Sequence, residues 1–279
     1  MRSIILVMLC SICFAANANE LKSGGDMKLG LNIAHLAHNA GESHIDSLHT
    51  ALYLNADYIF TNGILIGTDV LLGASVGNIN KHFPLQGTEN LTSQPPVGNE
   101  NILADGSYRV GYALKRRSID VPLYMAIGYK TTSFVARTVN IPSAGQIQAA
   151  YLPFELGGNI RVSPRLALEY LLAYDVGLSQ KILVVYDNGK NSTKLSAKKG
   201  YGLRLSLGSR YYVSQEVYFY ANILASYQFF GESQSASISI STPPGGATIT
   251  PGYIPGSSSV VSYPRSYISY VGLRFGIGF

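Results

Sequence analysis

The chain ends with the stretch Y-I-S-Y-V-G-L-R-F-G-I-G-F, which runs from Tyr267 to Phe279. From Val271 to Phe279 every second residue is large and apolar, and the residues between them are three glycines and Arg274, with Tyr270 preceding them on the same face. Successive side chains of a β-strand point to opposite faces, so this pattern gives one apolar face and one small or polar face. A strand that faces lipid on one side and a polar lumen on the other has this alternation. The stretch therefore predicts the last strand of a sheet that lies in a membrane.

Similar alternation recurs along the rest of the chain. Of the 279 residues, 47% are hydrophobic and only 13% are charged, and 20 tyrosines stand against no tryptophan. This composition favours many strands over a bundle of helices. We predict ten strands, at about residues 28–38, 48–60, 64–77, 102–114, 119–133, 147–162, 166–176, 201–211, 217–228 and 267–279.

The connections between these strands alternate between short and long. Short turns follow the second, fourth, sixth and eighth strands; the first of them, Thr61-Asn62-Gly63, is a tight turn because Asn-Gly accepts positive φ. Longer polar segments follow the other strands, at residues 38–47, 78–101, 134–146, 187–199 and 232–263. An even number of strands with short turns at one end and long loops at the other is typical of membrane β-barrels.

The outward aromatic residues form two groups that match the two ends of such a barrel. Aromatic belts mark the two membrane–water interfaces, and tyrosine and phenylalanine fill this role in the absence of tryptophan. The group at the short-turn end is Tyr58, Phe60, Tyr112, Tyr211, Phe219, Phe275 and Phe279, and the group at the long-loop end is Tyr129, Tyr174, Tyr201, Tyr227 and Tyr267.

The final stretch resembles the carboxy-terminal strand of bacterial outer-membrane β-barrels, whose terminal phenylalanine is read by the insertion machinery. The resemblance implies that Phe275, Ile277 and Phe279 form the insertion signal. It also implies an all-β fold: a ten-stranded antiparallel transmembrane β-barrel in outer-membrane lipid, with short periplasmic turns, long extracellular loops and both termini in the periplasm. The barrel-insertion machinery would be a partner.

The amino terminus has the features of a secretory signal peptide. Arg2 precedes an apolar run, Ile4 to Phe14, which is too short to span a bilayer as a helix, and Ala16-Asn17-Ala18 fits a cleavage site. We expect residues 1–18 to be the signal peptide and residues 19–279 to be one barrel domain. The only two cysteines, Cys10 and Cys13, lie in this segment, so we expect no disulfide and no thiolate metal site in the mature chain. Lipidation at Cys13 is the less favoured alternative.

The face opposite the apolar one carries charges of both signs, which would point into the lumen. A barrel of this size is filled largely by its own side chains. We expect a lumen charge network that neutralises itself and fills the barrel, with a selective narrow conduit as the alternative. The network consists of Asp57, Asp69, Asp105, Asp120, Glu155, Glu169 and Asp175 with Arg109, Lys130, Arg161, Arg165, Arg204, Arg210 and Arg274.

Two motifs could carry chemistry. The sequence Gly73-Ala-Ser-Val-Gly77 matches G-x-S-x-G, but the hydrolase elbow requires a following helix, so we expect small residues in a strand. Four of the five histidines gather near the first loop, where they could bind Zn²⁺ or Cu²⁺ or serve as a general base. We expect a solvated loop, with His44 and His49 as the only metal candidates and with no cofactor. The four are His35, His38, His44 and His49, near Glu42 and Asp46.

Ten strands and this length are similar to two groups of barrels, the omptin proteases and the adhesin-type barrels. The omptins use an Asp pair and an Asp–His pair at the external rim. This chain has no Asp-x-Asp and no histidine after His82, so half of that site is missing. The longest basic run is Lys115-Arg116-Arg117, which argues against a nucleic-acid partner.

Three functions remain, in decreasing order of preference. The first is a non-enzymatic surface protein whose loops, chiefly Asn78 to Asn101 and Glu232 to Tyr263, bind a host or other extracellular ligand, as an adhesin does. The second is a narrow, porin-like channel for small solutes. The third is a hydrolase at the external rim that depends on His44 and His49.

Overall fold

The computed structural model describes residues 24–41, 43–79, 97–117, 120–138, 144–186, 191–239 and 258–279. The expected signal peptide, residues 1–18, lies outside these ranges. The described chain is built of β-strands, and it contains no helix long and apolar enough to cross a membrane. The strands are β1 (Gly24–Ala40), β2 (Ser43–Ile59), β3 (Ile64–Ile79), β4 (Val97–Arg117), β5 (Asp120–Thr138), β6 (Ala144–Ser163), β7 (Leu166–Tyr186), β8 (Asn191–Ala197), β9 (Tyr201–Tyr212), β10 (Tyr218–Phe230), β11 (Ala236–Ser239), β12 (Ser258–Val261) and β13 (Ser266–Gly278).

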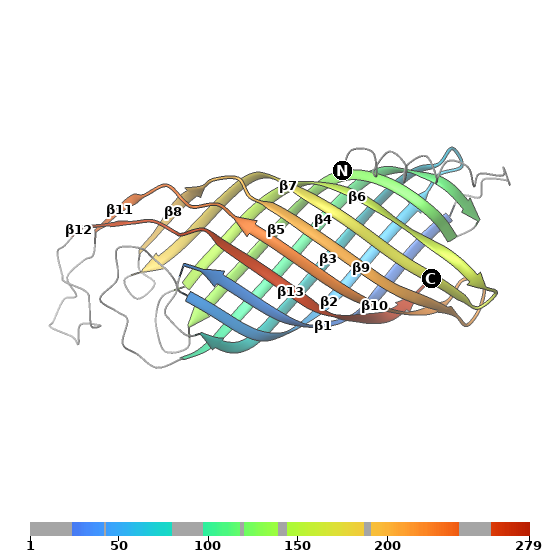
Figure 1. Cartoon of the computed structure of the whole chain (residues 1–279), viewed down its shortest axis with the longest axis horizontal. Coiled ribbons are helices and arrows are strands. Elements are labelled where there is room, and N and C mark those ends of the chain that lie inside the picture. Colours follow the sequence, from blue (N-terminus) through green and yellow to red (C-terminus); the bar gives the residue numbers. More distant parts are fainter. Residues whose placement is uncertain are drawn as a thin grey trace, which may run out of the picture.

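Ten of these strands close into a barrel. Their order is β6-β5-β4-β3-β2-β1-β13-β10-β9-β7, every neighbouring pair is antiparallel, and pairing between β6 and β7 closes the ring. Figure 1 shows these strands tilted against the long axis of the barrel, with β8, β11 and β12 beyond one end. The predicted fold class, a closed ten-stranded antiparallel barrel, is confirmed.

The two ends of the barrel differ, and we call them the turn end and the loop end. At the turn end, the β2–β3 turn has Gly63 at φ 93°, and the side-chain oxygen of Asn62 accepts a hydrogen bond from the Ile64 amide at 3.1 Å. The last residue, Phe279, lies at the same end and exchanges two backbone hydrogen bonds with Met27, at 2.8 and 2.9 Å. The loop end carries the β1–β2 turn and the strands β8, β11 and β12 (Figure 1).

The outer face of the barrel is apolar, as the alternation predicts. On β9, for example, Leu203, Leu205 and Leu207 are about half exposed, whereas the lumen-facing residues between them are less exposed. Aromatic rings pack together on this face near the loop end, where Tyr227 stacks on Tyr267 with ring centroids 5.4 Å apart. Near the turn end, the rings of Tyr58 and Phe60 lie 5.0 Å apart. These contacts place aromatic groups toward both ends of the apolar face.

The predicted first loop, residues 38–47, is wrong. β1 continues to Ala40 and β2 begins at Ser43, so the connection is a tight turn with Gly41 at φ 57°. Of the polar residues that suggested a loop, His44 and Asp46 lie on the outer face of the strands. His38, Ser43 and Ser47 are buried on the inner face, as are Leu36 and Ile45. The expected strict alternation of short and long connections therefore fails at the first connection.

The other four predicted loops also contain strand. In the segment 78–101, β3 reaches Ile79 and β4 starts at Val97. β5 reaches Thr138 and β6 starts at Ala144, which leaves little of the loop predicted at 134–146. The segment 187–199 contains β8, which pairs with the last seven residues of β7. The segment 232–263 contains β11 and β12, which pair with each other. The barrel strands thus continue beyond the ring at the loop end.

If the apolar outer face lies in lipid, the cost of placing a charge on it should depend on how deep in the bilayer the residue lies. We expect Leu205→Arg, in the middle of β9, to lower the free energy of unfolding by about 2–4 kcal/mol in a bilayer, because the charge must enter the hydrocarbon layer. Val213→Arg is the matched control, since Val213 is also exposed but lies at the turn end, where the cost is about 0–1 kcal/mol. Urea titration of the barrel folded into vesicles measures both. Equal losses in the two variants would contradict the assignment of the lipid-facing wall.

Candidate functional site: the charged lumen and the cap above it

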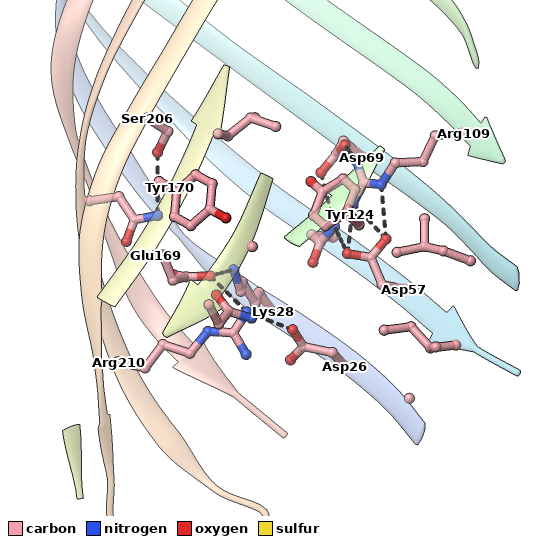
Figure 2. Close-up of a pocket in the computed structure, with 18 of the residues that line it drawn as sticks. Asp26, Lys28, Asp57, Asp69, Arg109, Tyr124, Glu169, Tyr170, Ser206 and Arg210 are labelled. Atoms are coloured by element: carbon pink, nitrogen blue, oxygen red, sulfur yellow. Dashed lines mark hydrogen bonds and ion pairs between the residues drawn. The ribbon is translucent and has the colours of Figure 1, made fainter. Parts of the chain in front are cut away.

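A first ion-pair cluster crosses the lumen near the turn end. Arg210 on β9 bonds to Asp26 on β1 and to Glu169 on β7, both at 2.7 Å, and Lys28 on β1 pairs with the same Glu169. Figure 2 shows these four side chains converging from opposite walls of the barrel. All four are largely buried, and the Tyr218 hydroxyl donates a further hydrogen bond to Asp26. The cluster therefore ties β1 to β7 and β9 through the interior.

A second cluster centres on Arg109 of β4. Its guanidinium group binds both oxygens of Asp57, at 2.5 and 2.7 Å, and also pairs with Asp69 (Figure 2). Asp69 accepts further hydrogen bonds from Tyr53 at 2.7 Å and from Asn55 at 3.0 Å. Arg109 is only 5% exposed, so its charge is compensated within the protein rather than by solvent.

From Arg109 a chain of alternating charges runs around the inner wall toward the loop end. Glu155 lies 3.6 Å from Arg109 and 2.8 Å from Arg204. Arg204 in turn binds Asp175 at 2.9 Å. Asp175 lies 3.2 Å from Lys130, whose ammonium group is also 3.7 Å from Asp105.

Ten of the predicted lumen charges thus take part in these ion pairs. Arg274 is placed differently: its guanidinium group stacks 3.6 Å above the Tyr53 ring. Arg161 is not part of the lumen network, because it is exposed at the turn end and donates to the Pro164 carbonyl at 2.9 Å. The Asp120 side chain lies outside the described part of the structure. The ten are Asp57, Asp69, Asp105, Arg109, Lys130, Glu155, Glu169, Asp175, Arg204 and Arg210.

Two members of the first cluster, Asp26 and Lys28, were not among the predicted lumen charges. Asp26 precedes the predicted strand, because β1 begins at Gly24, four residues earlier, whereas Lys28 is the first residue of that predicted strand. The signal was present in the sequence, because both residues have the same even numbering as the inward residues Asn32 and Ala34.

The ion pairs leave little free space in the described lumen. A cavity of about 80 Å³ lies beside the first cluster and Arg109, and a second of about 90 Å³ lies beside Asp105, Lys130 and Arg204. Each has room for several water molecules, since about 10–15 Å³ of such space holds one. Side chains therefore take up most of the described lumen beside these cavities.

Above the charged layer, the loop end is closed by an apolar core that we call the cap. Its side chains come from the ends of six barrel strands and from the segment before β13, and all of them are fully buried. Tyr263 enters this core and shares a hydrogen bond of 3.0 Å with His38, whose ring lies against Phe134. Burial raises the pKa of Tyr263 above its ordinary value, so the phenol stays protonated. The cap consists of Leu36, Ile45, Phe134, Ile147, Ile182, Phe230 and Tyr263.

The structure separates the two metal candidates. His44 lies on the outer face of β2, where its ring contacts Asp46 and Asn39. His49 is fully buried on the inner face of the same strand, beside the Tyr270 ring. Five residues along a strand reverse the direction of a side chain, so these two cannot share a metal ion or act together on a substrate. No group of metal-binding side chains occurs in the described ranges.

The G-x-S-x-G sequence lies within β3, as expected. Ser75 is buried in the lumen, where its hydroxyl group accepts hydrogen bonds from Ser47 at 3.1 Å and from Asn101 at 3.3 Å. β3 continues to Ile79 without the strand–helix elbow that a hydrolase nucleophile requires.

Comparison with known proteins identifies the class of fold. No protein-family model and no curated protein sequence matches the chain. Among solved structures, the outer-membrane protease OmpT from Escherichia coli is similar with a TM-score of 0.54 at 12% identity, over 94% of this chain and 99% of that one. The translocator domain of the autotransporter NalP from Neisseria meningitidis aligns with a TM-score of 0.40 at 12% identity, over 100% and 94%. The chain has the fold of the bacterial outer-membrane β-barrels.

Arg109 offers a test of the charged lumen. We expect Arg109→Met to lower the free energy of unfolding by about 3–5 kcal/mol, because Asp57 and Asp69 would remain buried without their cation. Adding Asp57→Asn and Asp69→Asn should recover a large part of the loss, since no uncompensated charge is then left. Arg161→Met is the control and should change stability by less than about 1 kcal/mol. Urea unfolding, monitored by band shift on cold gel electrophoresis, gives the free energy of unfolding of the wild type and the three variants. An Arg109→Met variant as stable as the wild type would show that these ion pairs do not stabilise the barrel.

Proposed function

We propose that this protein is a surface protein of the bacterial outer membrane that binds a partner outside the cell through the structure at its loop end. The barrel serves as a closed anchor in the membrane. In this proposal the turn end and both chain termini face the periplasm, and the loop end faces the exterior. Similarity of fold to outer-membrane barrels supports the location, and the short turns at one end support the orientation.

The main support for binding at the loop end is that strand structure continues there beyond the barrel ring. β9 ends its pairing with β7 at Val176, but β7 runs on to Tyr186 and pairs there with β8. β8 also contacts the segment that leads from β10 to β11. Ala197 and Ser233 form a β-bridge there, and the Gln234 amide donates a hydrogen bond to the Ser196 carbonyl at 2.8 Å. Surface loops positioned on a rigid scaffold are the usual place for binding residues.

The closed lumen supports the same proposal by removing the main alternative site. Ion pairs fill most of the middle of the barrel and the cap fills its loop end, so the described lumen offers no space for a ligand larger than several water molecules. The outer wall faces lipid. Binding of a soluble partner is therefore left to the exposed surface of the loop end.

We further propose that the protein is not an enzyme and that its last strand guides insertion. The hydrolase hypothesis needed His44 and His49 together, and they lie on opposite faces of the wall. Phe275, Ile277 and Phe279 are 41–49% exposed on the outer face of the final strand, which leaves the proposed insertion signal accessible to another protein.

Removal of the β11–β12 arm tests surface binding. We expect a variant in which residues 236–261 are replaced by a short Gly-Ser linker to fold normally, because β10 ends at Phe230 and β13 begins at Ser266, outside the deletion. Escherichia coli cells that display this variant should lose most of their attachment to epithelial monolayers and to immobilised matrix proteins. The same linker inserted at Gln215, in the turn end, is the matched control and should leave attachment unchanged. Full attachment after both this deletion and removal of residues 80–96 would refute the proposal.

Single-channel recording distinguishes the proposed closed anchor from the alternative function, a porin-like channel. We expect no steady conductance steps from the refolded protein in a planar bilayer, and none after removal of residues 236–261, because the charged layer and the cap stay in place. Discrete steps from the intact protein would establish a channel. Steps that appear only after the deletion would make the arm a plug.

A further inference from the structure

A hollow of about 500 Å³ lies on the outer wall of the barrel, in the part of β3–β7 nearer the loop end. Its volume is within the range of ligand sites, about 300–1,000 Å³. It is not used by the proposed function, and it lies on the opposite side of the wall from the charged lumen. Val70 and Leu72 of β3 line one side, and Lys181 of β7 lines the other.

The hollow arises because small side chains occupy adjacent outward positions on four neighbouring strands. The register pairs Gly106 of β4 with Thr131 of β5, Thr131 with Ala150 of β6, and Ala150 with Ser179 of β7. A second row of pairs, toward the loop end, runs from Ala104 through Ser133 and Gln148 to Lys181. Most of the other outward positions carry leucine, isoleucine, valine or an aromatic residue, although small residues such as Thr50, Ala74 and Ala221 also occur there.

Larger side chains bound the hollow above and below. Toward the turn end, the cross-strand pair Tyr108 and Tyr129 projects from the wall, with 71% and 49% of the side chains exposed. Toward the loop end, Ile102 projects in the same way and is 51% exposed. The depression is thus closed on its four sides and open to the surroundings of the barrel.

The open space is clearest at Gly106. A Cβ atom added there would meet only the Thr131 hydroxyl oxygen, at 3.8 Å, which is an ordinary contact. At the lumen-facing positions Gly111 and Gly128, by contrast, an added Cβ would come within 2.3 and 2.0 Å of backbone oxygens. Gly106 therefore has room for a side chain, and the space that it leaves faces outward.

Lys181 gives the hollow a charged rim. The outward residues that precede it on β7 are apolar: Leu172, Tyr174, Val176 and Leu178 are all partly exposed. Lys181 is the first charged residue on that face toward the loop end, and it pairs with none of the described carboxylates. A lysine at the edge of an apolar wall reaches toward the lipid headgroups, where phosphate is the available anion.

We propose that the hollow binds one phosphate-bearing lipid of the surrounding leaflet. An acyl chain lies over Gly106, Thr131 and Ala150, and the Lys181 ammonium group pairs with the phosphate. The floor of small side chains and the cationic rim match the acyl chain and the phosphate of such a lipid, in the order in which they occur across a leaflet. The site would hold a lipid more firmly than the remainder of the wall, where large side chains stand next to one another.

Quenching of a single indole tests the site, because the chain has no tryptophan of its own. Ile102→Trp places the fluorophore beside the hollow, and Ile223→Trp places it on β10, where Ile223 is 63% exposed. Each protein is refolded into vesicles of brominated phosphatidylcholine, and unbrominated phosphatidylglycerol is then added in increasing fraction. Phosphatidylglycerol that replaces the brominated lipid beside the indole restores its fluorescence. The fraction of phosphatidylglycerol needed for this recovery gives the preference for the anionic lipid at each position.

We expect the preference for phosphatidylglycerol at Ile102→Trp to exceed that at Ile223→Trp by about fivefold, the factor expected for one lysine near an anionic headgroup. High salt should reduce this preference, since screening at 1 M falls to about 3 Å. Equal preferences at the two positions would overturn the proposal. An indole at position 102 that no lipid quenches would also overturn it, because a second copy of the chain would then cover the wall.

Two variants locate the preference in the hollow. Lys181→Gln should remove the preference for the anionic lipid, whereas Lys199→Gln, an exposed lysine outside the hollow, should leave it unchanged. Gly106→Leu should remove it by filling the space, while Ala221→Leu adds the same bulk to β10 as the control. A preference that survives both Lys181→Gln and Gly106→Leu would refute the site even though the barrel folds.

Discussion

The structure depends on one constraint: every backbone amide and carbonyl group within the lipid must be paired inside the protein. The ring satisfies this constraint by joining β1 to β13 and β6 to β7, so that no barrel strand has a free edge in the membrane. The carboxy terminus takes part in the closure, because Phe279 pairs with Met27 at the end of the seam. Once the ring is closed, residues need only alternate between an apolar and a polar face, and this is why so much of the fold can be read from period-two patterns.

The two faces obey different rules. Outside, a charge meets hydrocarbon, and the outward positions in the middle of the wall are apolar or small. Inside, a charge is tolerated when another side chain compensates it, and Arg109, Arg204 and Arg210 each contact two or more carboxylates. These pairs join strands that are not neighbours in the sheet, such as β1 with β7. They therefore connect opposite walls as well as neutralise charge, although apolar packing of the same volume could be equally stable.

The sequence predicted the parts that alternation controls. Ten strands, their inward and outward faces, the tight turn at Gly63 and most of the lumen charges follow from the period of two and from turn chemistry. It failed where polar residues continue a strand beyond the apolar wall: His44 and Asp46 suggested a loop, yet the buried residues between them, such as Ile45, keep the strand period. The cap was missed for the same reason, since Phe134 and Ile147 fell at the borders of a supposed loop. The partner of each charge could not be predicted, because contacts across the lumen depend on register and not on local sequence.

The filled interior and the extended loop end have one origin. Strands long enough to rise above the lipid bring their inward side chains together without water between them, and those side chains form the cap. The same strands, where the ring no longer requires their pairing, leave edges on which β8 and the β11–β12 arm are built. Because the ring closes below these arms, their sequence can change without disturbing the pairing that the membrane demands. The barrel therefore determines where a binding surface can lie, whereas the identity of the partner depends on residues that no alternation constrains.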